Sequence, residues 1–153
     1  MGVYTIYEEQ FLPTSLEDAW KFVSDPHNLK VITPDYMRFN VLTKDLPDSV
    51  YSGLIIQYYV SPLLRIPMKW VTEITFVEPL KYFVDEQRVG PYRIWHHEHH
   101  LKAVDGGVLM IDRVTYQPPL GFLGSIANAL FIAKQLKGIF VYRRKKLEQL
   151  FPQ

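Results

Sequence analysis

The sequence lacks cysteine altogether and has no long uninterrupted run of apolar residues among its 153 positions. Without cysteine, thiol nucleophiles, disulfide bridges and cysteine-ligated zinc are excluded, and because this composition suits a reducing compartment, we expect a cytoplasmic location. The longest stretch free of charged side chains, 114–133, is interrupted by prolines and glycines, which argues against a membrane span. The first ten residues have neither a basic start nor a long apolar run, so we expect no export signal.

A large excess of charge of one sign is also missing. The chain has 17 basic and 16 acidic side chains and a net charge of +1, so we expect no nucleic-acid partner. Basic residues are nevertheless concentrated near the end of the chain, where Glu148 is the one acid among Lys134, Lys137, Arg143, Arg144, Lys145 and Lys146. Two interpretations are open: the solvated face of a terminal helix, or contact with an anionic partner such as a membrane surface.

Several catalytic motifs are absent as well. The sequence contains no serine nucleophile elbow, phosphate-binding loop or dinucleotide fingerprint, which excludes hydrolase, kinase and Rossmann chemistry of the usual kinds. Aromatic residues, in contrast, are abundant at 14%. Tyrosine and tryptophan combine an apolar ring with a polar tip, so this composition suits a domain with a large core or an aromatic-lined cavity.

The N-terminal third predicts one strand and two short helices. Alternating apolar residues indicate a strand over 4–12. A capping box of Thr14 and Glu17 is expected to begin the first helix, and Asp25-Pro26 the second, which ends near residue 33. The first helix should bury a stripe made of Leu16, Ala19, Trp20 and Val23.

The remainder predicts a sheet followed by one long helix. Turn signals divide the sheet region into six strands, at 39–44, 54–60, 68–77, 81–88, 92–104 and 108–116. Short connections make neighbouring strands antiparallel. The helix is expected to run to about residue 150 and to bury Leu123, Ile126, Leu130, Ala133, Leu136, Phe140, Leu147 and Leu150.

The order of elements is therefore one strand, two helices, six strands and one helix, in a single α+β domain over 1–153. One helix cannot fill the concave face of a seven-stranded, twisted and curved antiparallel sheet. We therefore expect an internal cavity between the sheet and the C-terminal helix, and we expect ligand binding there.

The hairpin around Asp105-Gly106 sets the expected site. A two-residue turn at these positions fixes the pairing of the flanking strands. On the inner face it places His99 opposite Asp112, His97 opposite Val114 and Trp95 opposite Tyr116, and on the outer face it places Glu98 opposite Arg113. A three-residue loop, the alternative, would place His99 opposite Arg113.

Alternation on the preceding strand adds further side chains to the inner face. We predict a ligand-binding set of Trp70, Phe83, Asp85, Gln87, Trp95, His97, His99, Asp112, Val114, Tyr116 and, on the terminal helix, Leu130. Three roles are open for the His99/Asp112 pair: a structural brace of the sheet, orientation of a ligand, or catalytic proton transfer. His97 and His99 could bind zinc only with a third ligand, Asp85 or Asp112, and since the spacing does not require it, we predict no metal and no cofactor.

Two stretches carry a family resemblance: Phe83-x-Asp85-x-Gln87-x-x-Gly90-Pro91-Tyr92-x-x-Trp95-x-His97-x-His99, and Met110-x-Asp112-x-Val114-x-Tyr116-x-x-Pro119-x-Gly121. With its order of elements, the chain resembles the helix-grip fold of the START, polyketide-cyclase and related SRPBCC superfamily. Within that superfamily, the two stretches look like those of the bacterial "ligand-binding SRPBCC domain" proteins. The resemblance implies a deep cavity for a small, largely apolar molecule without naming that molecule.

Two functions follow from these expectations. The first is binding, for carriage or sensing, of a small hydrophobic or amphipathic molecule. The alternative is an enzyme of the cyclase, dehydratase or isomerase kind that uses His99 and Asp112 for proton transfer. The apolar stretch 122–133 with its basic continuation offers a lid, a homodimer contact or a transient contact with an anionic membrane.

Overall fold

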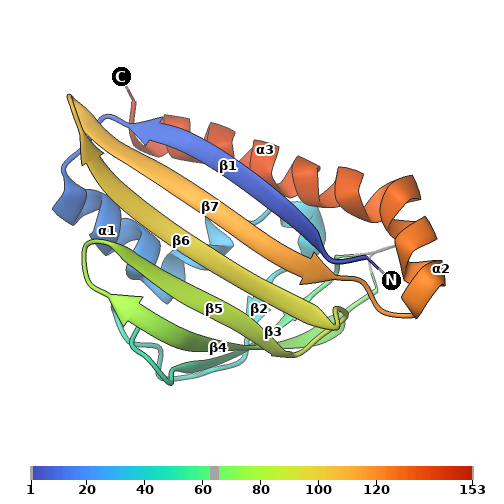
Figure 1. Cartoon of the computed structure of the whole chain (residues 1–153). Helices are drawn as coiled ribbons and strands as arrows, with labels where there is room; N and C mark the ends of the chain where they lie inside the picture. The colour runs from blue at the N-terminus through green and yellow to red at the C-terminus, as the bar shows by residue number, and fades with distance from the viewer. Residues whose placement is uncertain (1, 63–65, 153) are drawn as a thin grey trace.

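The computed structural model describes residues 2–62 and 66–152. Its strands form one antiparallel sheet in the order β1-β7-β6-β5-β4-β3-β2 (Figure 1). The strands are β1 (Tyr4–Leu12), β2 (Asn40–Val41), β3 (Ile55–Val60), β4 (Met68–Glu78), β5 (Tyr82–Val89), β6 (Ile94–Val104) and β7 (Gly107–Gln117). All seven predicted strands are present. The second is shorter than expected, because the N–H groups of Leu42 and Thr43 both bond to the Gln57 carbonyl and the regular ladder ends there.

The helix after β1, α1 (Leu16–Ser24), begins one residue later than the sequence suggested. Ser15, not Thr14, is its N-cap, with its Oγ accepting a hydrogen bond from the Asp18 N–H at 3.1 Å. The Thr14 N–H is held by the Leu12 carbonyl in the turn that follows β1, so the predicted capping box is wrong. Two 3₁₀ helices follow, η1 (Pro26–Lys30), capped by Asp25 as expected, and η2 (Asp35–Met37).

The C-terminal helix is continuous but not regular. It consists of α2 (Gly121–Ala127), a π-helical turn η3 (Asn128–Ile132) and α3 (Ala133–Leu150). Leu136, Phe140 and Leu147 are buried as predicted. The other five members of the predicted stripe are exposed, so the prediction is wrong for Leu123, Ile126, Leu130, Ala133 and Leu150. The extra residue in a π turn shifts the helical phase, so Gly124 and Asn128 occupy the buried face there instead.

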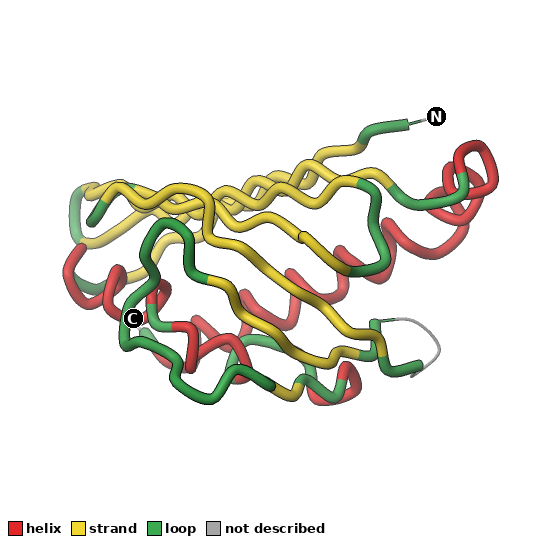
Figure 2. Tube along the Cα trace, turned by 90° about the horizontal axis from the view of Figure 1, so that it is seen from below, coloured by secondary structure: helices red, strands yellow, loops and turns green. Residues whose placement is uncertain are grey.

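The sheet curves around α3, and α1 covers the other end of its concave face (Figures 1 and 2). The β6–β7 hairpin has the predicted register, with Val104 paired with Gly107 across the Asp105-Gly106 turn. Gly106 has φ +80, which a glycine adopts without strain. No helix in the described part of the chain is both long and apolar enough to cross a membrane.

Candidate functional site

A cavity of about 150 Å³ lies between the concave face of the sheet and α3. A smaller cavity of about 60 Å³ lies near α1 and shares part of its lining. One wall of the larger cavity is aromatic, with Trp70 and Trp95 in edge-to-face contact at 5.3 Å between ring centroids and Tyr92 packed on both. The helix contributes the aliphatic and aromatic side chains of Leu136, Ile139 and Phe140. Most of this lining is therefore apolar.

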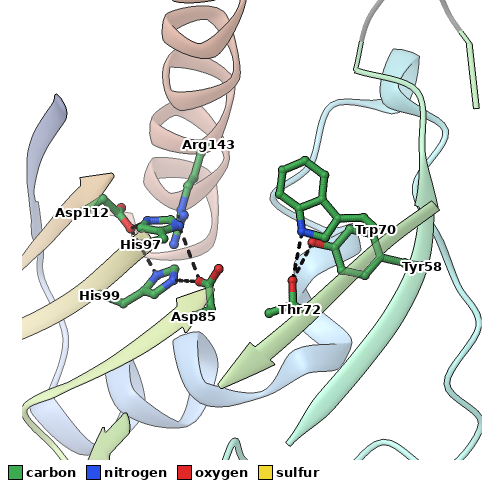
Figure 3. Close-up of polar contacts among 8 residues, drawn as sticks. All are labelled: Tyr58, Trp70, Thr72, Asp85, His97, His99, Asp112 and Arg143. Carbon is green, nitrogen blue, oxygen red and sulfur yellow. Dashed lines mark hydrogen bonds and ion pairs between the residues drawn. The ribbon is translucent and has the colours of Figure 1, made fainter. Parts of the chain in front are cut away.

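Polar side chains gather around one end of the cavity, where Asp85, His97, His99 and Arg143 line it and Asp112, although predicted to bind the ligand, does not. They come from four elements: Asp85 from β5, His97 and His99 from β6, Asp112 from β7 and Arg143 from α3 (Figure 3). Strand pairing brings the first four together, because Asp85 pairs with His97 and Asp112 with His99, and all four side chains project from the concave face. We call these five residues the inner cluster.

Each imidazole of the inner cluster lies between two carboxylates. His97 Nε2 is 2.8 Å from Asp112 Oδ1, and His99 Nε2 is 2.5 Å from Asp85 Oδ2. The remaining nitrogens make longer contacts: His97 Nδ1 is 3.6 Å from Asp85 Oδ2, and His99 Nδ1 is 3.2 Å from Asp112 Oδ1 without the alignment of a hydrogen bond. The predicted proximity of His99 and Asp112 is present, but the well-formed hydrogen bond of His99 goes to Asp85.

Arg143 completes the inner cluster from the helix. Its Nη1 lies 3.3 Å from Asp112 Oδ1, and its side chain is 11% exposed. Its Nε has no hydrogen-bond partner among the described residues. The run of basic residues is therefore not one solvated face, since Arg143 points inward and the neighbouring Arg144 bonds to Glu8 at 3.1 Å.

Burial and neighbouring charges shift the pKa of both carboxyl groups and both imidazoles of the inner cluster. Burial raises the pKa of the Asp112 carboxyl, but the charge of Arg143 and the contacts with both imidazoles outweigh it and hold the pKa well below its usual range. Burial is likewise outweighed at Asp85, whose pKa is lowered by the hydrogen bond with His99 and by nearby positive charge. Burial and the charge of His99 lower the pKa of His97. At His99 the contacts with Asp112 and Asp85 outweigh burial and raise the pKa, so His99 holds a proton more readily than His97.

A second polar group lies on the opposite wall. The Trp70 indole N–H donates to Thr72 Oγ1 at 3.1 Å, and the Tyr58 hydroxyl lies 3.1 Å from the same oxygen (Figure 3). Burial raises the pKa of the Tyr58 hydroxyl, which keeps it neutral. These groups satisfy one another, and they give the aromatic wall a hydroxyl-bearing edge.

The other predicted site residues take different places. Phe83 lines the smaller cavity and stacks on His99 with ring centroids 4.3 Å apart. Val114 and Tyr116 are fully buried against the C-terminal helix, and the Tyr116 hydroxyl donates to Asn128 Oδ1 at 2.8 Å. Gln87 instead braces the loop before β6, since its Nε2 donates to the Tyr92 carbonyl at 2.6 Å.

Leu130 does not belong to the cavity lining, because it is 72% exposed on the outer side of the helix. Sequence reasoning also missed Arg143, although a signal was present. Arg143 follows Phe140 by three residues and precedes Leu147 by four, which places it on the buried stripe. A basic residue on a stripe that faces a sheet with buried acids could have been identified as their partner.

The sequence matches no protein-family model and no curated protein. Protein CV1439 from Chromobacterium violaceum is similar in structure, with a TM-score of 0.73 and 13% identity over 97% of this chain and 98% of its own. The major latex-like protein 151 of Panax ginseng has a TM-score of 0.70 and 9% identity over 99% of both chains. A nucleoside-diphosphate sugar epimerase from Corynebacterium glutamicum has a TM-score of 0.65 and 23% identity over 94% of this chain and 28% of its own.

At these identities the likeness establishes the fold. These neighbours and the observed architecture agree: a curved seven-stranded antiparallel sheet holds a long C-terminal helix. The chain therefore has the helix-grip fold predicted from its resemblance to the SRPBCC superfamily.

Proposed function

We propose that the protein binds a small hydrophobic or amphipathic molecule in the cavity between the sheet and α3, and carries or senses it. The observation that supports this most is the division of the cavity into a large apolar wall and one polar end. Such a site holds the body of a ligand by burial of apolar surface and orients it with a few polar groups. The helix-grip neighbours have a fold suited to the same task.

The polar end favours a ligand with a hydrogen-bond acceptor. Arg143 is buried, and its Nε lacks a partner in the described structure. A buried donor without an acceptor costs about 1 to 3 kcal/mol, so a carbonyl, hydroxyl or carboxylate oxygen that reached it would be stabilised. The apolar body would then lie against Trp70, Trp95 and Ile139. A cavity of about 150 Å³ suits a small molecule such as a medium-chain alcohol or a single ring.

The test is titration with octan-1-ol and octanoate. Binding is monitored by tryptophan fluorescence, because Trp70 and Trp95 line the cavity. The variant Ile139→Phe fills the cavity and should weaken binding at least tenfold, whereas Val141→Phe, on the exposed side of the same helix, should leave it unchanged. Native mass spectrometry of the purified protein should also release a co-purified apolar compound. Equal affinities for the two variants, or no binding of either probe, would refute the proposal.

A second function, proton transfer of the cyclase, dehydratase or isomerase kind, is supported by the position of His99. His99 lines both cavities and contacts two carboxylates, an arrangement that can hold and release a proton beside a bound carbonyl compound. Asp112 would act there as a positioning residue. If this function operates, His99→Ala should abolish turnover of a carbonyl substrate and leave its binding nearly unchanged. Equal loss of binding and turnover would instead assign His99 to ligand orientation.

The surface around α2 supports a contact with an anionic bilayer, where apolar ligands are dissolved. Its exposed apolar side chains are Leu120, Phe122, Leu123, Ile126, Leu130 and Phe131. Lys134 and Lys137 are exposed directly after them, and no acidic residue occurs between Asp112 and Glu148. An apolar surface bordered by lysines is typical of interfacial membrane contact.

Flotation with liposomes tests the membrane contact. The protein should float with vesicles that contain phosphatidylserine and not with vesicles of phosphatidylcholine alone. Phe122→Asp should abolish flotation, and Val141→Asp, exposed on α3 away from this surface, should not. A concentration-dependent dimer that Phe122→Asp dissociates, without flotation, would assign the surface to a second copy of the chain.

A further inference from the structure

Two imidazoles and one carboxylate converge at the polar end of the cavity (Figure 3). His97 Nδ1 lies 3.6 Å from Asp85 Oδ2, and His99 Nε2 lies 2.5 Å from the same oxygen. One donor atom from each of the three residues lies within 4.8 Å of the others. We propose that Asp85, His97 and His99 bind a divalent transition-metal ion, for which Zn²⁺ is the test ion. This goes beyond the binding of an apolar molecule.

The supporting contacts around the two imidazoles favour this assignment. In both rings, the nitrogen that does not face Asp85 faces Asp112, at 2.8 Å for His97 and 3.2 Å for His99. A carboxylate behind a metal-binding imidazole fixes which nitrogen is free to bind the ion and raises its basicity. Asp112 is itself held by Arg143 at 3.3 Å. Of the two carboxylates considered from the sequence as a third ligand, the geometry therefore selects Asp85 and makes Asp112 a positioning residue.

The distances are close to those that an ion requires. Zinc lies about 2.0 to 2.2 Å from nitrogen and oxygen ligands, so ligand atoms around a tetrahedral ion are about 3.3 Å apart. The separation of His97 Nδ1 and Asp85 Oδ2 is already 3.6 Å. The separation of His99 Nε2 and Asp85 Oδ2 must increase by roughly 1 Å from its hydrogen-bonded value, a shift that rotation of the Asp85 carboxylate supplies.

Charge and access also suit a cation. With neutral imidazoles, the inner cluster has the two negative charges of Asp85 and Asp112 against the single positive charge of Arg143. A net negative charge in a buried site is stabilised by a bound cation. All three proposed ligands line the cavity, so a fourth coordination position faces the space where an apolar ligand with an oxygen atom would bind.

The outer face of the same strands provides an internal control. Glu86, His96, Glu98 and His100 form a second set of imidazoles and carboxylates there, with each side chain 22% to 36% exposed. In the described structure these four do not form a group of three converging donor atoms, whereas Asp85, His97 and His99 do. Solvent competes at exposed sites, so the inner residues and not the outer ones should determine metal affinity.

The experiment is calorimetric titration of the full chain with ZnCl₂ after removal of metal with EDTA and dialysis. We expect one ion per chain. Asp85→Asn and His99→Gln should each weaken binding at least a hundredfold, and Asp112→Asn should weaken it about tenfold to a hundredfold. The control variant His96→Ala/His100→Ala should bind as the unmodified protein does. Titration with Co²⁺ should produce visible absorption bands of nitrogen and oxygen coordination, which the inner variants lose and the outer control keeps.

Circular dichroism and octan-1-ol binding in EDTA show whether each variant is folded, and they separate this proposal from the proposed function. A folded inner variant that has lost Zn²⁺ binding supports the metal site, whether or not it still binds octan-1-ol. Absence of Zn²⁺ binding to the unmodified protein overturns it. So does binding that the His96→Ala/His100→Ala variant loses and the inner variants keep. None of these outcomes depends on whether an apolar ligand is found.

Discussion

The two faces of strands β5 and β6 carry the same chemistry in different surroundings. On the concave face, Asp85 contacts His97 and His99; on the convex face, Glu86 contacts His96 at 2.8 Å. Side chains alternate along a strand, so these groups are neighbours in sequence and lie on opposite sides of the sheet. Only the concave set is enclosed by a helix and an aromatic wall. Burial, and not the choice of residues, therefore makes the histidine and carboxylate cluster on the concave face a candidate site.

The largest expected difference between the faces follows removal of one carboxylate charge. Asp112→Asn leaves Arg143 buried without its ionic partner, and breaking a buried ion pair costs about 3 to 5 kcal/mol. Glu98→Gln is the matched change on the outer face, where Glu98 is 22% exposed, and it should cost less than about 1 kcal/mol. Urea denaturation of both variants measures the free energy of unfolding. Similar losses would mean that the inner cluster is effectively solvated.

Two adjacent residues of β5 give a second, smaller difference. Asp85→Asn weakens a buried hydrogen bond to a charged carboxylate, which is worth about 1.5 to 3 kcal/mol. Glu86→Gln changes the neighbouring residue on the outer face and should cost less than about 1 kcal/mol, since exposed ion pairs contribute little. Thermal unfolding of the two variants under the same conditions tests this. A larger loss for Glu86→Gln would reverse the assignment of the two faces.

Much of this arrangement could be predicted from the sequence, because local chemistry fixes it. The Asp105-Gly106 turn sets the register of β6 and β7, and the register alone places His99 opposite Asp112. The hydrogen-bond partners could not be predicted. They depend on side-chain torsions and on the position of β5. Asp85 of that strand forms a hydrogen bond with His99, whereas Asp112 contacts His99 without forming one.

The helix was predicted less well than the sheet. The predicted stripe assumes one regular α-helix from 123 to 150. A π turn at 128–132 shifts which residues face the sheet, and Leu130 is exposed. The position of a π turn depends on how the helix packs against the sheet, which no local pattern reports. The lining residues Tyr58 and Tyr92 were also not identified as site residues, although Tyr92 belongs to one of the stretches that carry the family resemblance.

The register that separates the two faces depends on the turn. Gly106→Ala tests the importance of that turn, and Gly138→Ala, in α3, is a control with the opposite expected sign. Gly106→Ala places a Cβ at φ +80 with only an ordinary contact to Phe11 at 3.9 Å, so backbone strain should destabilise the protein by about 1 kcal/mol. Gly138→Ala, inside α3 where the added Cβ meets nothing within 4 Å, should stabilise it by about 1 kcal/mol. Thermal denaturation gives both values, and a stabilising Gly106→Ala would show that the turn does not require glycine.

The smallest expected effect is the coupling between His96 and Glu86 on the outer face. A double-mutant cycle of His96→Ala and Glu86→Gln, measured near pH 6, should give about 0.2 to 1 kcal/mol, because both side chains remain in contact with water. Raising the salt concentration to about 1 M shortens the screening distance to about 3 Å and should remove most of this coupling. The inner pair of His97 and Asp112, almost wholly buried, should keep its coupling in the same salt. If salt removes both couplings equally, water and ions reach the inner cluster freely, and the contrast between the two faces does not hold in solution.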